Sequence, residues 1–167
     1  RLRRSVPILP EAAEPQGQTL GHFTRSLRVV GIGESTMAGV GVSQHSNGFI
    51  GSFTRNLARH SQCNIVWSVY AENGIKTHQI AGKLGEQIQE EEVDLIVIAL
   101  GANDAFALRT PNQFERDIQS LIAYLRNKFG QNTTILFTNM APIYIFPAFS
   151  PLMRWVIGGL VRLFGQV

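Results

Sequence analysis

The apolar residues occur in two patterns that alternate along the chain. One is a short continuous run, and the other is a longer segment in which they have helical spacing. Each continuous run predicts a strand, and these runs lie at residues 27–32, 64–71, 93–100 and 133–139. Each spaced segment repeats its apolar positions every three or four residues and predicts a helix, at residues 48–60, 77–90 and 114–129. The run at 93–100 is nearly all apolar, which is typical of a strand buried on both faces.

This alternation of strands and helices predicts an α/β fold with a central parallel sheet and helices on both of its faces. Residues 1–26 contain three prolines and little periodicity, so we expect them to form an extended lead-in on the surface of one domain at 27–167. Ligands bind beyond the carboxyl ends of the strands in open parallel sheets. Chemistry is therefore expected in the turns that follow the four strands.

The composition narrows the classes of function. The 167 residues include 15 basic and 12 acidic side chains and one cysteine, Cys63. A single cysteine excludes an internal disulfide and a multi-thiolate metal site. The basic excess lies at the two ends without a basic stripe, so no nucleic-acid partner is expected. The sequence contains no run of about 18 apolar residues, so it predicts no membrane-spanning segment.

The segment at 151–164 is amphipathic but unusually apolar. Arg154, Gly158 and Arg162 follow one another at a spacing of four and predict a narrow polar face on a helix. The remaining positions are almost all hydrophobic. We expect this helix either to pack on the domain or on chain that follows residue 167, or to be a lid or interfacial helix that contacts acyl chains or a membrane surface as a peripheral element.

Three residues at the predicted strand ends could carry chemistry together. Ser35 follows the first strand in a turn of small residues, Gly74 follows the second strand, and Asn103 follows the third. Taken singly, Ser35 could cap a helix and the other two could be ordinary turn residues. Together they form a nucleophile with three donors for an oxyanion: the Ser35 N–H, the Gly74 N–H and the Asn103 amide.

This set of residues resembles the signature blocks of the SGNH hydrolase family, the GDSL-like lipases and esterases. The Gly-Glu-Ser at 33–35 is similar to the first block, which is usually Gly-Asp-Ser. Gly74 matches the glycine of the second block, and Gly-Ala-Asn-Asp at 101–104 matches the Gly-x-Asn-Asp block. The tail at 147–155 is similar to bacterial members of the family.

The resemblance covers about residues 27–142 and implies a flavodoxin-like, three-layer α/β/α sandwich. It also implies a serine ester hydrolase that works without a metal or other cofactor through an acyl-enzyme on Ser35, with Gly74 and Asn103 in the oxyanion hole. The implied substrate is a small-molecule or lipid acyl ester, with an esterase, lipase or thioesterase activity.

Two departures from the family pattern stand out. Glu34 replaces the usual aspartate, and we expect it to alter a supporting contact rather than to act as the base. The family takes its base from a late Asp-x-x-His block, and that motif does not occur in this sequence. We therefore expect the last strand and the Asp/His loop to follow residue 167. Of the four histidines, His22 lies in the lead-in and His60 ends a surface helix. His45 and His78 follow the Ser35 and Gly74 turns and could be bases, but we expect each to be a surface or substrate-edge residue.

Two alternatives stay open at this point. The chain could be a non-catalytic binding domain that keeps the pocket and has no base. It could also be a nucleotide-binding domain of the flavodoxin or Rossmann type, because Gly31 and Gly33 follow the first strand and Glu72 follows the second. The glycine spacing differs from Gly-x-Gly-x-x-Gly, however, and Asn103 would have no role.

Overall fold

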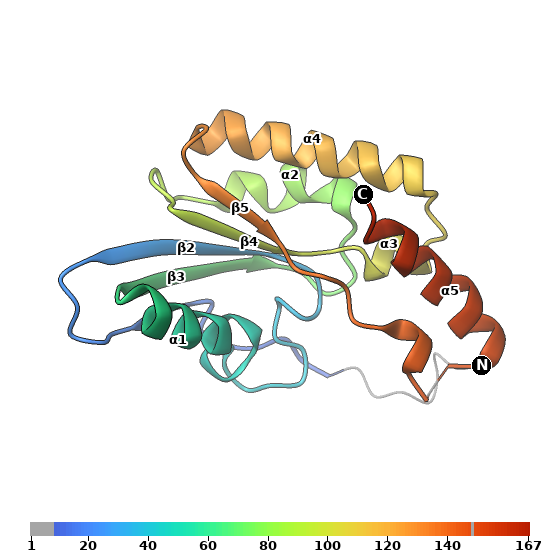
Figure 1. Ribbon diagram of the computed structural model, residues 1–167, viewed down its shortest axis with the longest axis horizontal. Helices are drawn as coiled ribbons and strands as arrows, with labels where there is room; N and C mark the ends of the chain where they lie inside the picture. The colour runs from blue at the N-terminus through green and yellow to red at the C-terminus, as the bar shows by residue number, and fades with distance from the viewer. Residues whose placement is uncertain (1–8, 148) are drawn as a thin grey trace.

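The computed structural model describes residues 9–147 and 149–167, and its elements follow the predicted alternation (Figure 1). The strands are β1 (Gln16–Thr19), β2 (Ser26–Gly33), β3 (Asn64–Ala71), β4 (Leu95–Ala99) and β5 (Thr134–Phe137). The helices are α1 (Phe49–Ser61), α2 (Ile80–Lys83), α3 (Ala102–Phe106), α4 (Pro111–Phe129) and α5 (Pro151–Phe164). The short 3-10 turns are η2 (His45–Asn47), η3 (Thr77–Gln79), η4 (Gly85–Gln87) and η5 (Ile143–Ile145).

The strands form one sheet in the order β1-β3-β2-β4-β5. Strand β2 pairs in parallel with β3 and β4, and β4 pairs in parallel with β5. Helix α1 covers one face of the sheet, and α2 and α4 cover the other (Figure 1). The predicted α/β fold with a central parallel sheet is therefore confirmed, and it carries one antiparallel strand at its edge.

That antiparallel strand, β1, lies within the segment for which the sequence predicted only an extended lead-in. Its residues are mostly polar and do not alternate between apolar and polar, so the sequence shows no strand pattern there. The segment becomes a strand by pairing with the edge of β3. Gly17 is paired with Trp67, and a Cβ at residue 17 would lie 2.3 Å from the indole ring. The ring of Trp67 therefore covers Gly17 and holds β1 in place. Residues 1–8 of the lead-in lie outside the described part.

The continuous helix predicted over 77–90 is wrong, because the segment is divided into η3, α2 and η4. Gly85 passes so close to α4 that a Cβ there would lie 2.6 Å from the Tyr124 ring. Apolar residues still face the core at helical intervals, which explains the prediction. Helix α3 was not predicted, since its five residues are too few to show a period.

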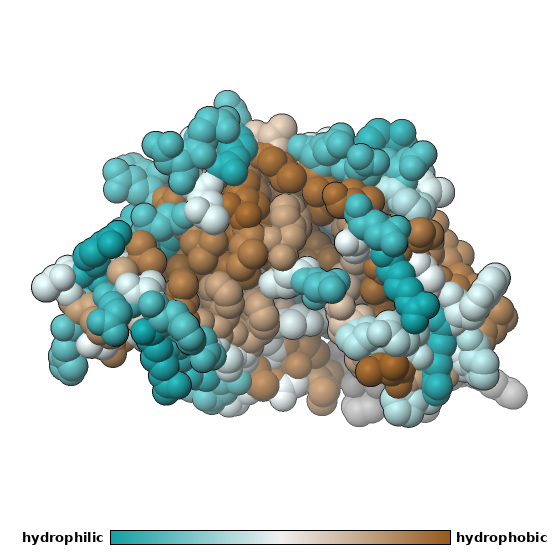
Figure 2. All heavy atoms as spheres, viewed as in Figure 1, coloured by the Kyte–Doolittle hydropathy of each residue, from teal (hydrophilic) through white to brown (hydrophobic). Residues whose placement is uncertain are grey.

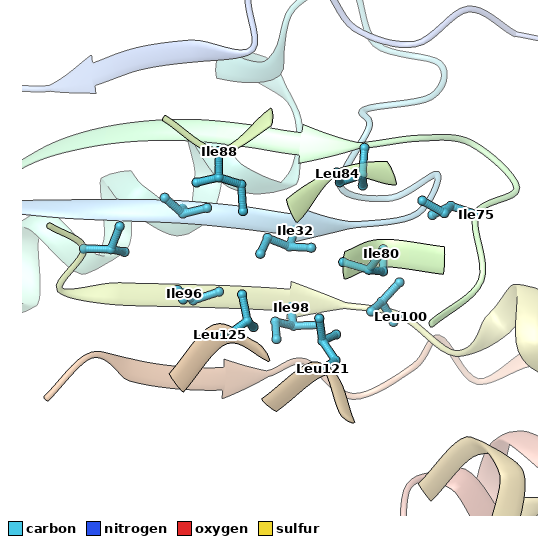
Figure 3. Packing of buried hydrophobic residues seen from close by; sticks show 12 residues of the cluster. Ile32, Ile75, Ile80, Leu84, Ile88, Ile96, Ile98, Leu100, Leu121 and Leu125 are labelled. Atoms are coloured by element: carbon cyan, nitrogen blue, oxygen red, sulfur yellow. The ribbon is translucent and has the colours of Figure 1, made fainter. Parts of the chain in front are cut away.

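Two hydrophobic clusters hold the layers together. On one face, Ile32, Ile96 and Ile98 of the sheet pack against Leu121 and Leu125 of α4 (Figure 3). On the other face, a second cluster joins the sheet to α1, and its fully buried members include Val29, Ile50, Ile65 and Val97. Successive residues of β2 enter opposite clusters, as the alternation of side chains in a strand requires.

The register brings three strand ends to one level. Gly33 of β2 is paired with Ala71 of β3 on one side and with Ala99 of β4 on the other. The chain runs from β2 to β3 in one direction and then crosses back to β4, so the strand order reverses beside β2. Ligands bind at such a reversal in open α/β sheets. Helix α5 lies beyond this end of the sheet (Figure 1).

None of the helices in the described ranges is both long enough and apolar enough to cross a bilayer.

Candidate active site

Ser35 lies in a tight turn that begins directly at the end of β2. The Glu34 N–H donates to the Ala99 carbonyl at 3.1 Å, which continues the pairing with β4, and the Ser35 carbonyl accepts from the Val40 N–H at 3.0 Å. A Cβ at residue 33 would lie 2.5 Å from the Ala99 carbonyl oxygen, so only glycine fits before the turn. The sequence therefore places Ser35 at a fixed position on the sheet edge, where it is half-buried.

Ser35 lines a cavity of about 230 Å³ at the reversal of the strand order. The cavity lies between the ends of β2 and β4, the start of α1 and the segment that follows β5. Its lining is mostly apolar, and it includes Ser35, Thr36, Phe49, Leu100, Thr138, Asn139 and Met140. Residues 138–141 belong to the turn after the fourth predicted strand, one of the turns in which chemistry is expected. No local pattern marks any of them as a site residue, and nothing in the sequence indicates that they fold back over the Ser35 turn.

Glu34 is a buried carboxylate that joins the Ser35 turn to α3. Its two oxygens accept from the backbone N–H groups of Ala102 and Asn103, each at 2.9 Å. Burial raises the pKa of Glu34, while these two hydrogen bonds favour its charged form and nearby Asp104 disfavours it. The residue thus makes a supporting contact between the Ser35 turn and α3, and both of its oxygens are engaged.

Asn103 connects α3 to the turn that contains Gly74. Its side-chain amide donates to the Ile75 carbonyl at 3.1 Å, and its backbone N–H donates to Glu34. One amide hydrogen is held by Ile75, and the second has no acceptor among the described residues. Gly101, which precedes α3, has φ +117°, a left-handed conformation that favours glycine.

Gly74 adopts φ +89° in an exposed turn after β3. A Cβ there would meet no atom within 4 Å, so the backbone conformation rather than crowding selects glycine. The turn is anchored to the start of the Ser35 turn, because the Glu72 N–H donates to the Gly33 carbonyl at 3.2 Å. No acceptor for the Gly74 N–H occurs in the part of the chain that is described.

The structure therefore connects the three predicted turns through a continuous set of hydrogen bonds. Glu34 joins the Ser35 turn to Asn103, and Asn103 joins α3 to the residue after Gly74. The sequence suggested that these turns lie at the same sheet edge, but it contained no sign that a carboxylate and an amide bridge them.

No histidine among the described residues lines the Ser35 cavity. His45 is buried, and its Nδ1 lies 3.0 Å from the Ala13 carbonyl. His60 is exposed on α1, and His78 is exposed on η3. His22 lies in the lead-in beside β1. The prediction that His60 and His78 are surface residues agrees with their exposure, whereas His45 is enclosed by the lead-in.

A buried polar cluster behind Asn103 was not predicted. Asp104 is fully buried, and one of its oxygens accepts from the Thr77 N–H at 3.0 Å and from the Thr77 hydroxyl at 2.8 Å. Arg109 pairs with Asp117 and approaches Asp104 at 3.7 Å. The side chains of His78, Asp104 and Asp117 each have an atom that could bind a metal ion, and these atoms lie within 4.8 Å of one another. The guanidinium of Arg109 already provides the positive charge that balances the two aspartates. We therefore interpret the cluster as a structural link between η3, α3 and α4.

The residues that suggested nucleotide binding have structural roles. A Cβ at residue 31 would lie 2.7 Å from the Met37 sulfur, so Gly31 permits the Ser35 turn to pack on β2. Gly33 permits the close approach of β4 described above. Glu72 forms an ion pair with Lys83 at 2.8 Å. These contacts account for all three residues without a dinucleotide.

Comparisons with known proteins agree with this architecture. The model of the GDSL-like lipase/acylhydrolase family matches residues 32–167. The fold is similar to that of the lipase Lip_vut3 from a goat rumen metagenome, with a TM-score of 0.64 and 18% identity over 84% of this chain and 75% of that chain. It is also similar to Axe2, an acetylxylan esterase from Geobacillus stearothermophilus, with a TM-score of 0.56 and 13% identity over 84% and 72%. A search of curated proteins finds no match.

Proposed function

Because the chain belongs to the GDSL-like lipase/acylhydrolase family, we propose that it hydrolyses esters through an acyl-enzyme on Ser35. The observation that supports this most directly is the hydrogen-bonded link from the Ser35 turn through Glu34 and Asn103 to the Gly74 turn. A serine nucleophile needs donors fixed around the carbonyl oxygen that it polarises, and such a link holds candidate donors in place.

In the proposed reaction, the Ser35 Oγ attacks the ester carbonyl carbon while a general base accepts the hydroxyl proton. The carbonyl oxygen becomes an oxyanion, to which the N–H groups of Ser35 and Gly74 and the second amide hydrogen of Asn103 donate. The alcohol then leaves with the proton from the base, and Ser35 keeps the acyl group. A water molecule, deprotonated by the same base, releases the acid and restores the serine.

The general base of this scheme is proposed to be an imidazole, the usual partner of a serine nucleophile. No histidine in the described ranges lines the Ser35 cavity, so the proposal requires an imidazole that reaches the cavity from elsewhere. Glu34 is not assigned this role, because both of its oxygens accept hydrogen bonds from α3.

The substrate is proposed to carry an apolar acyl group. Phe49, Leu100 and Met140 line the cavity beside Ser35, and these side chains suit a hydrocarbon better than a hydrated sugar. The two similar structures are a lipase and an acetylxylan esterase, so ester hydrolysis is common to both names although their substrates differ.

Labelling with a fluorophosphonate probe tests the nucleophile. A protein of this sequence, supplied with any further native residues, should be labelled, and Ser35→Ala should abolish the labelling. Ser43→Ala is a matched control, because Ser43 is an exposed hydroxyl in the same loop and should leave labelling unchanged. Labelling that survives Ser35→Ala would exclude Ser35. If the complete protein is never labelled, the alternative of a non-catalytic binding domain is favoured instead.

A further inference from the structure

Helix α5 packs with an apolar side facing solvent. Its buried side contacts α3 and α4, and Phe164 stacks on Phe114 with ring centroids 4.3 Å apart. On the opposite side, Leu152 is 68% exposed, Trp155 is 77% exposed and Leu163 is 47% exposed. Positions at intervals of three and eight residues share one face of a helix. An exposed apolar patch of this kind is typical of a surface that contacts another protein or a membrane.

Only part of the narrow polar face predicted for α5 faces solvent. Gly158, in the centre of this face, is buried against Tyr144 of η5. The contact is so close that a Cβ at residue 158 would lie 2.8 Å from the Tyr144 Cβ. Tyr144, Trp155, Arg154 and Arg162 line one shallow groove between η5 and α5. We call the exposed set of Tyr144, Leu152, Trp155, Arg162 and Leu163 the docking face.

Among the residues that the structure describes, Arg154 and Arg162 have no acidic partner. The guanidinium of Arg154 donates to the carbonyl groups of Pro147 and Phe149, and that of Arg162 lies 4.2 Å from the centre of the Tyr144 ring. No acidic residue occurs anywhere between 118 and 167. The two positive charges are therefore available to an anionic group that approaches the apolar surface.

From this arrangement we infer that the docking face binds the interface of a membrane that contains anionic phospholipids. Helices at such interfaces place tryptophan and leucine among the lipid chains while arginine meets the phosphate groups. Trp155 and Leu152 match the first role. Arg162 matches the second, together with Arg154, which lines the adjoining groove. Anionic phospholipids provide negative charge over a continuous surface, so they can meet both arginines while the lipid chains receive the apolar side chains.

The position of the docking face also relates it to the Ser35 cavity. Residues 138–141, which line the cavity, continue directly into η5, whose Tyr144 belongs to the docking face. Helix α5 lies at the end of the molecule toward which the parallel strands run (Figure 1). Membrane docking would thus bring the cavity close to the lipid surface. The binding itself does not depend on the proposed hydrolysis.

Vesicle sedimentation of the protein, supplied with any further native residues, tests the inference. The protein should sediment with vesicles of phosphatidylcholine and phosphatidylserine, more weakly with phosphatidylcholine alone, and less as the salt concentration rises. Trp155→Ser should weaken the binding about tenfold, since a large apolar group is lost. Arg162→Gln should weaken it about fivefold, since one charge near the surface is lost. Leu152→Ser is a second apolar variant in case Trp155→Ser folds poorly.

Matched controls separate this face from the rest of the surface. Leu20 is 68% exposed, as Leu152 is, but it lies beside the opposite ends of the strands, and Leu20→Ser should bind like the wild type. Arg59→Gln on α1 is the corresponding charge control. Fluorescence gives an independent readout: Trp67 is buried, so a blue shift on binding must come from Trp155.

Three results would overturn the inference: no binding to anionic vesicles, equal weakening by the control variants, or no blue shift from Trp155. Self-association that Trp155→Ser abolishes, in the absence of vesicle binding, would assign the face to a second copy of the chain instead. Ser35→Ala should bind vesicles normally, so a failure of the proposed hydrolysis and a failure of docking are distinguishable.

Discussion

Glu34 holds two turns of the candidate site together through a single carboxylate. Its oxygens satisfy the N–H groups of Ala102 and Asn103 at the start of α3. A buried N–H without a partner costs about 1–3 kcal/mol, so this contact fixes the position of α3 relative to Ser35. The substitution of glutamate for the usual aspartate was visible in the sequence, whereas the partners of its carboxylate depend on the packing of α3 against β2.

Alanine variants of Gly74 and Gly130 can separate the effect of backbone strain on stability from an effect on catalysis. Both have positive φ, at +89° and +83°, and a Cβ at either position would meet no atom within 4 Å. Replacing either by alanine should therefore lower the free energy of unfolding by about 1–3 kcal/mol. Only Gly74→Ala should slow the labelling of Ser35, by on the order of 10- to 100-fold, because the Gly74 N–H is a proposed oxyanion donor and would be displaced.

Chemical denaturation and the rate of fluorophosphonate labelling measure the two effects. Gly130→Ala is the control, since Gly130 follows α4 at the other end of the sheet. Equal labelling rates for both variants would contradict a role for Gly74 in the oxyanion hole.

The segment between β3 and β4 shows how tertiary contacts divide an element. Its apolar residues Ile80, Leu84 and Ile88 face the core at intervals of four, as they would in one continuous helix. Gly85 nevertheless lies against Tyr124, and the helix ends before it. Periodicity therefore identified the buried side of the segment correctly, whereas the close approach of α4 determined its backbone conformation.

Two glycines of this segment are expected to respond in opposite directions to alanine. Gly85→Ala should lower the free energy of unfolding by about 1–3 kcal/mol, because its Cβ would lie 2.6 Å from Tyr124. Gly82→Ala should raise it by about 0.5–1 kcal/mol, because Gly82 is exposed in α2 and its Cβ would meet no atom within 4 Å. Urea denaturation of both variants tests the pair, and a stable Gly85→Ala protein would contradict the close packing.

The topology of the whole molecule assembles the candidate site. Because Gly33, Ala71 and Ala99 end three adjacent parallel strands at one level, the turns after them open on the same edge. Residues from beyond β5 then cover the Ser35 turn and complete the cavity. On the face shown in Figure 2, hydrophobic side chains gather along β5, where Leu136 and Phe137 are exposed, between hydrophilic surfaces over α4 and α1.

The 167-residue chain by itself should hydrolyse p-nitrophenyl acetate only slightly above background. No histidine in the described ranges lines the cavity, and oxyanion donors without a base retain only residual catalysis. A spectrophotometric assay measures the rate, with Ser35→Ala as the reference. Robust turnover would show that a base lies within these residues, and His45 and His78 would then be the first to replace.

The sequence by itself determined the α/β class, the strands β2 to β5, the long helix α4, the bounds of α5 and the three turns that could carry chemistry. These follow from local periodicity and from small residues at strand ends, which act over a few neighbouring positions. Only the tertiary structure decided the pairing of β1 with β3, the division of 77–90, and the side of α5 that faces solvent. It also decided that Glu34 and Asn103 bridge the turns around Ser35, because these contacts join residues up to 69 positions apart, whose proximity no local pattern records.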